Sequence, residues 1–367
     1  MDVKNAFLNG DLYEEVYMTP PPDVAHQLGE VCRLRKALYG LKQAPHAWFE
    51  KFSTVITSLG FICSHHDFAL FVKCTSACRI LLSLNVDDMI ITRNDSDGIK
   101  SLKSELSRCF AMKDLGMLLY FLGIEVSYSP KGYLLSQSKY IADLFDRARL
   151  TDNRIVDTPL EPNARYFLLD EIPLSDFSLY RTIVGSLVYL IVTRPNITHV
   201  VHVVSQFVTA PTTVHWAAVL RILRYLRGTQ FQSLLFPSTS SLDLHAYSDA
   251  DWADDLTDRK STTGFCTFLG DSLISWKNMG IYLHHPTPLY CDNQSAIQIA
   301  RNSVFHERTK HIDIDCHVTH HHLQRRSITL PLVSSSPQIA DMFIKTHSTS
   351  RFCFLSDKLS MLIAVAS

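Results

Sequence analysis

Two adjacent aspartates, Asp87 and Asp88, lie between two apolar runs with strand-like composition, residues 80–84 and 89–92. The intervening segment 85–88 is four residues long and contains three polar residues, so this part of the chain predicts a β-hairpin with the aspartates in its turn. Neighbouring carboxylates raise each other's pKa unless a cation or hydrogen-bond donors offset their charges. Because Asp is also common in ordinary turns, a plain turn and a metal-binding turn both stay open at this point.

Strand and helix signals alternate through the first third of the chain. An apolar run covers residues 3–8. The pattern then predicts helices at 44–59 and 99–110 and a hairpin formed by 118–126 and 133–135. A polar stretch from Asp157 to about Pro173 then predicts a linker. Helical patterns follow at 179–189, 197–207 and 215–227. The serine-rich residues 236–243 predict a further boundary. Beyond it, strands are predicted at 244–248, 264–269, 273–276 and 289–291, with a helix at 294–300.

Length and charge narrow the class of protein. At 367 residues the chain exceeds the usual size of one hydrophobic core, so several domains are expected. Its 35 Lys and Arg against 36 Asp and Glu give a formal net charge of -1, which counts against a strongly basic nucleic-acid-binding protein. Arg221, Arg224 and Arg227 still recur on one face of a predicted helix, where a basic stripe and a solvated amphipathic helix are both open interpretations.

Cysteine usage and hydropathy indicate the compartment. The nine cysteines are odd in number and show no repeated CxxC spacing, which argues against a disulfide framework and a cysteine zinc ribbon. No apolar run reaches the length of a membrane span, and the N-terminus lacks the layout of a signal peptide. We therefore expect an intracellular protein of the cytoplasm or nucleus, without a membrane partner.

A long ordered series of segments resembles the Pol polyprotein of copia-type LTR retrotransposons, which carries reverse transcriptase and ribonuclease H. The segments are MDVKNAFLNGDLYEEVYM, LYGLKQAPHAWFEKF, NVDDMIIT, MKDLGMLLYFLGIEV, LSQSKYI, DTPL, YRTIVGSLVYL, TRPNI, HWAAVLRILRYLRGT, YSDADWADDLTDRKSTTGF, PLYCDNQSAI, RTKHIDI and IADMFIKT. The resemblance implies an α+β fold. It places a ferredoxin-like reverse transcriptase palm and thumb in 1–158, a helical connection in 159–238, an incomplete ribonuclease H-like α/β domain in 239–347 and a C-terminal tail in 348–367.

The resemblance also implies a polymerase site. Asp2, Asp87 and Asp88 match the carboxylates that hold two Mg²⁺ ions, which clamp the attacking and leaving oxygens in phosphoryl transfer. The implied partners are an RNA template, a DNA primer, an RNA–DNA hybrid and deoxynucleotide triphosphates (dNTP). The oligomeric state stays open.

Six further residues match the family's nucleotide and primer contacts. Phe7 matches a steric gate against a 2′-hydroxyl, with plain strand packing as the alternative. Lys42 and Gln43 match an element that contacts template and nucleotide, with loop backbone as the alternative. The family's primer grip matches Phe121, Leu122 and Gly123, with an ordinary hairpin as the alternative.

Two departures from the family pattern affect the predicted polymerase. Asn85 replaces the tyrosine of the usual YVDD motif, which removes an aromatic contact to the primer end. Met1 falls inside the first motif, so the fingers region is expected to be missing and Asp2 to lie beside a charged, frayed terminus. We therefore expect no processive polymerase activity from this chain.

The ribonuclease H site is expected to be incomplete as well. By the resemblance, Asp249, Asp292 and Asp341 are three of four carboxylates that hold two Mg²⁺ ions, and Asp251 is an alternative ligand ranked below Asp249. Asp341 is expected on a late helix within IADMFIKT. The fourth, a glutamate on a helix, should lie between the strands ending at 276 and beginning at 289. Residues 277–288 contain no glutamate, and the segment that they form is too short and too rich in Gly and Pro to hold that helix. We therefore expect no appreciable RNA cleavage.

A run of histidines offers a separate candidate metal site. Its members are His306, His311, His317, His320, His321 and His322. His317 and His321 have the i, i+4 spacing that chelates zinc on a helix, but a polar, partly exposed helix is the alternative. Three functional classes therefore stay open: an active enzyme, a non-catalytic nucleic-acid-binding remnant, and a pseudogene-like product without a role.

Overall fold

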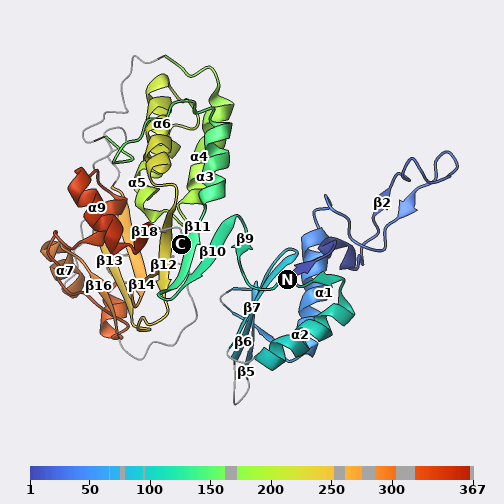
Figure 1. The fold of residues 1–367 in the computed structure, drawn as a ribbon. Helices are drawn as coiled ribbons and strands as arrows, with labels where there is room; N and C mark the ends of the chain where they lie inside the picture. The colour runs from blue at the N-terminus through green and yellow to red at the C-terminus, as the bar shows by residue number, and fades with distance from the viewer. Residues whose placement is uncertain are drawn as a thin grey trace. The chain divides into compact units, whose positions relative to one another are not determined.

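The fold is described from a computed structural model, drawn in Figure 1. It describes residues 1–65, 67–74, 79–93, 96–161, 172–251, 261–274, 286–302 and 319–363. The chain divides into two compact units, Met1–Leu118 and a second unit that begins at Leu119. This division falls inside the segment 1–158 that was assigned to one palm-and-thumb domain, and the predicted domain limits stay predictions. Among the described residues, no helix is long and apolar enough to cross a membrane.

A six-stranded antiparallel sheet in the order β4-β5-β6-β7-β1-β8 forms the frame of the first unit. Its strands are β1 (Asp2–Val3), β4 (Ile62–Cys63), β5 (Leu70–Cys74), β6 (Arg79–Asn85), β7 (Asp88–Arg93) and β8 (Met112–Lys113). The predicted hairpin is confirmed, because Asn85 pairs with Asp88 and leaves Val86 and Asp87 as the turn. Strand β1 lies between β7 and β8, so the start of the chain is next to this hairpin.

Helices α1 (Ala44–Ser58) and α2 (Ser96–Cys109) supply the apolar cover of this sheet. Burial alternates along β6, with Ile80, Leu82 and Leu84 facing the core. They pack with Trp48 of α1 and Leu106 of α2 in one cluster, as the period of two in a strand and the amphipathic spacing in a helix require. One face of the sheet is therefore covered by both helices.

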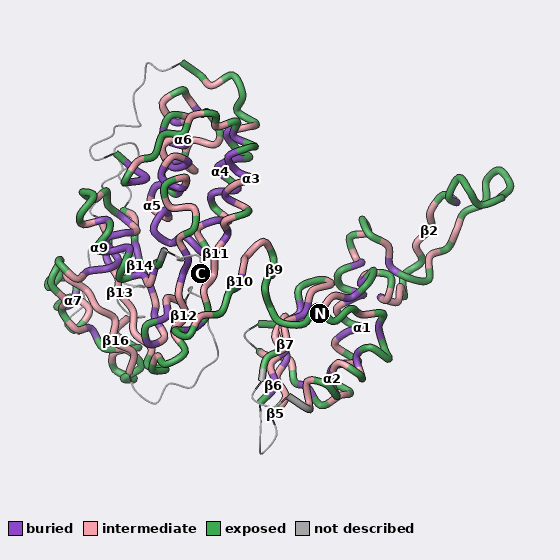
Figure 2. Tube along the Cα trace, in the orientation of Figure 1, coloured by how far each residue is buried: buried purple, intermediate pink, exposed green. Residues whose placement is uncertain are grey.

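A two-stranded ribbon of the first unit is largely exposed. Strands β2 (Tyr17–Met18) and β3 (Cys32–Arg33) pair with each other and with no other described strand. Figure 2 shows the chain around β2 as mostly exposed. Between β1 and β2, the short 3₁₀ helix η1 (Ala6–Asn9) packs against α1.

The second unit contains two five-stranded sheets, the first in the order β18-β12-β11-β10-β9. Its strands are β9 (Tyr120–Phe121), β10 (Ile124–Ser129), β11 (Gly132–Ser136), β12 (Gln232–Pro237) and β18 (Met361–Ile363). The hairpin predicted near 118–135 is present as the antiparallel strands β9, β10 and β11. Because β11 also pairs with β12, these strands belong to the second unit.

The other sheet has the order β15-β14-β13-β16-β17. Its strands are β13 (Leu244–Ala250), β14 (Thr263–Leu269), β15 (Ser272–Ile274), β16 (Thr287–Tyr290) and β17 (Ile328–Thr329). Strands β13, β14 and β15 are antiparallel, whereas β16 is parallel to β13 and to β17. The ends of β13 and β16 therefore lie at the same edge of the sheet, which positions the site described below.

Helices of the second unit pack around a single large core. They are α3 (Ser138–Arg147), α4 (Phe177–Leu190), η2 (Pro195–Ile197), α5 (Thr198–Ser205), α6 (Thr213–Gly228), α7 (Gln294–Arg301), η3 (Ile339–Phe343) and α9 (Thr349–Lys358). The helices predicted at 179–189, 197–207 and 215–227 are confirmed as α4, α5 and α6, and that at 294–300 as α7. Tyr180, Leu187, Ile222 and Leu226 are fully buried between them.

Three features of the second unit differ from the local sequence pattern. Strand β12 runs into the serine-rich segment that was predicted to be a boundary, because β11 and β18 both pair with it. Residues 348–367, expected to form a tail, include α9 and β18, which bury Leu355 and Met361. The IADMFIKT segment, expected to be an ordinary helix, contains only the short 3₁₀ helix η3. The sequence predicts that no helix lies between β15 and β16. Residues 275–285 of that segment are outside the described residues, so this prediction is not tested.

Candidate functional site

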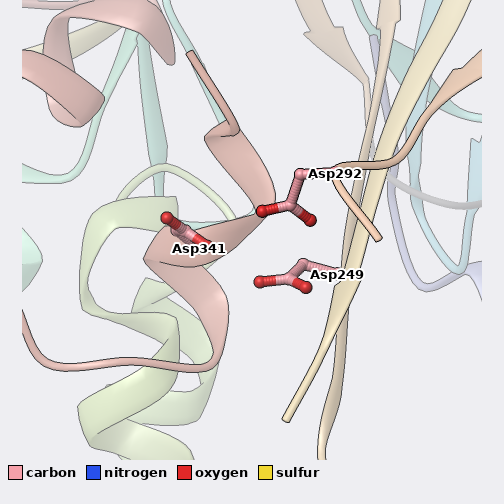
Figure 3. Close-up of side chains that lie close together, drawn as sticks. All are labelled: Asp249, Asp292 and Asp341. Carbon is pink, nitrogen blue, oxygen red and sulfur yellow. The ribbon is translucent and has the colours of Figure 1, made fainter. Parts of the chain in front are cut away.

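Three of the predicted aspartates meet at the edge of the mixed sheet. Asp249 is near the end of β13, Asp292 follows the parallel strand β16, and Asp341 lies in η3. One carboxylate oxygen from each lies within 4.8 Å of the other two, and Figure 3 shows the side chains close together. Carboxylate oxygens are the ligands that Mg²⁺ and Mn²⁺ prefer, so this donor set fits a divalent ion.

Basic side chains partly neutralise this cluster. Lys345 Nζ lies 2.8 Å from Asp249 Oδ2 and 2.9 Å from Asp341 Oδ1, and Arg351 Nη2 lies 3.3 Å from Asp341 Oδ2. Burial raises the pKa of Asp249, and the nearby carboxyl of Asp341 adds to that rise, whereas Lys345 opposes it. Burial lowers the pKa of Lys345, but its hydrogen bonds to Asp249 and Asp341 outweigh burial and raise it overall. The site therefore holds an ammonium among carboxylates.

The third carboxylate is held by neutral donors. Ser335 Oγ donates to Asp292 Oδ2 over 3.0 Å, and Gln338 Nε2 lies 3.4 Å from Asp292 Oδ1. Gln338 is fully buried and also donates to the backbone oxygen of Ser248 over 3.1 Å. One amide thus links β13 to the residue that follows β16, and it fixes the orientation of Asp292.

A glycine lets η3 approach the sheet. Gly264 of β14 pairs with Asp249 of β13, and a Cβ there would lie 2.8 Å from Ile344 Cγ2 and 2.9 Å from Phe343 Cβ. Real Cβ atoms do not tolerate such distances, so any larger residue must push η3 and Asp341 outwards. The position of the Asp341 carboxylate therefore depends on the absence of a side chain at residue 264.

Asp251, the alternative ligand, is engaged elsewhere. Its Oδ1 accepts a hydrogen bond from the Thr262 backbone N–H over 2.9 Å, and it does not belong to the cluster of the three aspartates. The cluster therefore contains Asp249 and not Asp251, while the roles of both residues stay predictions. Sequence reasoning missed Lys345, Arg351, Ser335 and Gln338, although the i, i+4 spacing of Asp341 and Lys345 was a usable signal.

The aspartates of the first unit are neighbours but form a looser group. Asp2 of β1 is directly opposite Asp88 of β7. The flanking bonds run from Val3 N to Asp87 O and from Met89 N to Met1 O, both 2.8 Å. This makes Asp2 and Asp88 a non-hydrogen-bonded pair, the arrangement that brings facing side chains closest. Burial raises the pKa of Asp88, and the charges of Asp87 and Asp2 raise it further.

The three carboxylates of the first unit do not converge as the three of the second unit do. Among the described residues, the cluster of Asp249, Asp292 and Asp341 is the only group of its kind within 4.8 Å. The oxygens of Asp2, Asp87 and Asp88 therefore do not all come within that distance of one another. In the part of the chain that the structure describes, three carboxylates with converging oxygens are found only at the second site.

The turn that carries Asp87 has an unusual backbone. Val86 has a φ of 54°, which is costly for a β-branched residue. Its carbonyl oxygen accepts a hydrogen bond of 2.6 Å from Nε1 of Trp48, a buried residue of α1. Asn85, the residue in place of the family's tyrosine, is exposed at the end of β6. The helix below the sheet thus holds the hairpin turn.

Phe7, Lys42 and Gln43 lie around the start of α1. Phe7 packs on Tyr39, with ring centroids 4.7 Å apart, and lines an open apolar pocket together with Trp48 of α1 and Val86 of the turn. Lys42 is exposed, and Gln43 is the N-cap residue of α1 without a side-chain cap. Phe7 therefore lies beside the hairpin turn, while the roles of all three residues stay predictions.

Phe121, Leu122 and Gly123 form the turn between β9 and β10. Phe121 pairs with Ile124, so Leu122 and Gly123 are the two turn residues, with φ of 49° and 78°. Two positive φ values are typical of a type I′ hairpin turn. The Leu122 carbonyl oxygen accepts a hydrogen bond from the Tyr189 hydroxyl of α4. The primer-grip role of this turn stays a prediction.

Half of the histidine run lies outside the described residues, namely His306, His311 and His317. His320 has both ring nitrogens within hydrogen-bond distance of partners, the Ala300 carbonyl oxygen and Gln324 Nε2. The ring of His322 contacts Ser327 Oγ through Nδ1 at 2.9 Å. The described histidines form no metal cluster, and the predicted pair of His317 and His321 is not tested.

Comparison with known proteins identifies the family. The family model described as Reverse transcriptase (RNA-dependent DNA polymerase) matches residues 1–162. The chain is 38% identical, over 99% of its length, to the Retrovirus-related Pol polyprotein from transposon RE2 of Arabidopsis thaliana, of which it covers 27%. It is also 31% identical, over 78% of its length, to the Putative transposon Ty5-1 protein YCL074W of Saccharomyces cerevisiae, of which it covers 95%.

Two solved structures share the fold. They are the structure of the foamy viral protease-reverse transcriptase dRH in complex with ds DNA and that of the foamy viral protease-reverse transcriptase in complex with RNA/DNA hybrid. Each has a TM-score of 0.50 and 10% identity. The likeness to the first structure covers 92% of this chain and 56% of that structure's chain. The likeness to the second covers 95% of this chain and 44% of that structure's chain. The α+β fold class of a reverse transcriptase is confirmed.

The chain therefore belongs to the reverse transcriptase family. Its relatives from Arabidopsis and from Nicotiana tabacum, the latter the Retrovirus-related Pol polyprotein from transposon TNT 1-94 at 35% identity, place it with retrotransposon Pol polyproteins, as the copia-type resemblance predicted. The chain spans 27% and 30% of those two polyproteins.

Proposed function

We propose that this chain acts on nucleic-acid duplexes as the reverse transcriptase and ribonuclease H region of a retrotransposon Pol polyprotein. We propose further that Asp249, Asp292 and Asp341 form its divalent-ion site. The observation that carries the proposal is the convergence of their carboxylate oxygens, within 4.8 Å of one another, at the shared edge of two parallel strands. Family membership supplies the class of substrate, namely an RNA–DNA hybrid, a primed RNA template and dNTP.

Each residue of the site has a distinct task in this proposal. Asp249 and Asp341 hold the cation through oxygens that now accept from Lys345, and Asp292 presents a carboxylate oriented by Ser335 and Gln338. A bound Mg²⁺ or Mn²⁺ supplies the positive charge that stabilises a phosphodiester during hydrolysis. The low exposure of Asp249 and Asp341, 8% and 7%, keeps water from competing for their oxygens.

We also propose that cleavage at this site is slow. Two-metal hydrolysis requires carboxylates for both ions, and residues 277–288 supply neither Asp nor Glu. With three carboxylates and two basic neighbours, the cluster retains too little negative charge to hold a second ion firmly. The retained function is therefore binding of the hybrid and of a metal ion, with impaired turnover.

A second site is proposed in the first unit. Asp2 and Asp88 face each other across β1 and β7 with Asp87 next to them, and this supports a Mg²⁺ site for nucleotide addition. Their looser spacing means that the metal or substrate must draw the carboxylates together. Primer extension is therefore expected to be weak, in keeping with the loss of the aromatic residue at Asn85.

The full chain tests the proposal in three measurements. Isothermal titration calorimetry with MnCl₂ uses the full chain carrying Asp88→Asn, so that the proposed site of the first unit does not contribute. It should show saturable binding that Asp292→Asn removes, while Asp143→Asn, on the exposed face of α3, leaves it unchanged. Fluorescence anisotropy should show that an RNA–DNA hybrid binds and is released as salt rises. RNA in the hybrid should stay essentially intact.

Two outcomes would contradict these expectations. Absence of saturable Mn²⁺ binding in the folded protein would remove the metal site. Rapid cutting of the hybrid, abolished by Asp249→Asn, would show that three carboxylates suffice and would overturn the proposal of impaired turnover.

A further inference from the structure

We propose that Lys345 is the resident counter-ion of the aspartate cluster and that a divalent ion must displace its ammonium group in order to bind. This inference rests on the proposed metal site and assigns a role to a residue outside the predicted ligand set. It makes Lys345 a positioning residue, because it acts through the carboxylates.

The ammonium and a metal ion would compete for the same oxygen atoms. Lys345 Nζ lies 2.8 Å from Asp249 Oδ2 and 2.9 Å from Asp341 Oδ1, so it bridges two of the three carboxylates. The other oxygens of these two carboxylates already accept from the Ala250 backbone N–H and from Arg351, so a cation between the aspartates must draw on the oxygens that Lys345 holds. Occupation by one cation therefore excludes the other.

The side-chain exposures show which partner can move. The Lys345 side chain is 46% exposed, whereas the side chains of Asp249 and Asp341 are 8% and 9% exposed. A lysine has a flexible stem and a strongly hydrated head group, so its ammonium can turn into water without moving the backbone. Asp249 in β13 and Asp341 in η3 are held by their elements. Exchange therefore proceeds by release of the lysine.

The charges of the cluster fit such an exchange. The three aspartates oppose Lys345 and Arg351, which leaves a net charge of about -1. Release of Lys345 changes this to about -2, which one divalent ion balances. Arg351 keeps its contact with the other oxygen of Asp341, Oδ2, so one basic neighbour remains after the exchange. The charge of the cluster therefore suits the replacement of one ammonium group by one divalent ion.

The exchange has a measurable consequence for affinity. When only the fraction of molecules with Lys345 turned away can bind metal, the apparent dissociation constant rises by the inverse of that fraction. If the bridged form is favoured by about tenfold, removal of the ammonium tightens Mn²⁺ binding by about tenfold. A wild-type protein therefore binds Mn²⁺ more weakly than its three carboxylates allow.

Calorimetric titration with MnCl₂ tests the inference on the full chain carrying Asp88→Asn, in which the proposed site of the first unit does not contribute. We expect Lys345→Gln to bind Mn²⁺ about tenfold more tightly than the wild type. Lys345→Arg, which keeps a cation, should not gain affinity. Lys131→Gln, which removes an exposed lysine in the turn between β10 and β11, serves as the matched charge control and should bind as the wild type does.

Thermal melting provides a second readout that does not depend on activity. Without metal, Lys345→Gln should melt at a lower temperature than the wild type, because two buried carboxylates lose their partner. With rising Mn²⁺ its melting temperature should increase more steeply, and the size of the increase reports affinity even for a variant that is unstable without metal.

The outcomes separate this inference from the proposal on which it rests. Equal, saturable Mn²⁺ binding by the wild type and Lys345→Gln, lost in Asp292→Asn, would overturn the role of Lys345 and leave the metal site standing. No saturable binding by either protein would remove the site and the inference together.

Discussion

Replacing Trp48 by Phe tests how the hairpin that carries Asp87 and Asp88 is held. Nε1 of Trp48 donates to the Val86 carbonyl oxygen over 2.6 Å, and the side chain is 2% exposed. Val86 has a φ of 54°, a left-handed conformation that costs roughly 1–3 kcal/mol for a residue other than glycine. The contact holds a strained turn residue against α1. Its loss should therefore loosen the hairpin before the rest of the unit.

Two contributions set the size of the effect. Loss of the hydrogen bond costs about 1 kcal/mol. The smaller ring also leaves unfilled space beside Phe110 and Phe52, whose centroids lie 5.1 Å and 5.6 Å from that of Trp48. At about 0.8 kcal/mol per buried carbon-sized group, this adds roughly 1–2 kcal/mol. We expect the free energy of opening to fall by about 2–3 kcal/mol, which corresponds to a change of about 30-fold or more.

Hydrogen exchange measured by mass spectrometry is the suitable assay, because it reports each region of a two-unit protein separately. Peptides from β1, β6 and β7 should lose about 30-fold in protection in Trp48→Phe, while those from β13 and β14 keep theirs. Trp216→Phe makes the same chemical change in α6 of the second unit and should leave the β6–β7 hairpin unaffected. Unchanged protection of that hairpin in Trp48→Phe would refute the reasoning.

Two further predictions concern the second unit. Gly264→Ala should weaken Mn²⁺ binding about tenfold and lower stability by roughly 2 kcal/mol, because the new Cβ pushes η3 and Asp341 away from Asp249. Calorimetry measures the affinity and thermal melting measures the stability. A variant that binds Mn²⁺ as the wild type does would contradict this prediction. The pKa of His199 is lowered by burial to about 4, so the unfolded chain takes up this proton first as the pH falls. Its contribution, roughly 3 kcal/mol, should be fully present above pH 6.5 and be lost between pH 6.5 and about 4. Urea titrations across this range should show a steeper loss of stability than the same titrations of His199→Asn; parallel curves would rule the effect out.

Local patterns predicted the elements that depend on neighbouring residues. The β6–β7 hairpin follows from two apolar runs around a polar turn, and α4, α5 and α6 follow from helical spacing between prolines. Strands β12 and β18 have no such signal, because each is a strand by pairing with partners distant in the sequence. The same holds for η3, whose position depends on Gly264 in another element.

For the candidate sites, resemblance supplied the aspartates, and their spatial relations came from the fold. The structure brings Asp249, Asp292 and Asp341 together, whereas the oxygens of Asp2, Asp87 and Asp88 do not all converge in the same way. Side-chain partners such as Gln338 could not be predicted from the sequence. Its hydrogen bond to Asp292 joins residues 46 positions apart, and such a contact produces no periodic pattern in the sequence.

The amino-acid sequence by itself determined the family, the hairpin of paired aspartates and the absence of an acidic residue between 277 and 288. Only the tertiary structure decided that Lys345 is inserted between Asp249 and Asp341, since Lys345 and Asp249 are 96 residues apart. The reason is physical: hydrophobic periodicity and turn chemistry act over a few residues, whereas the charge balance of a site depends on which elements the folded core brings together.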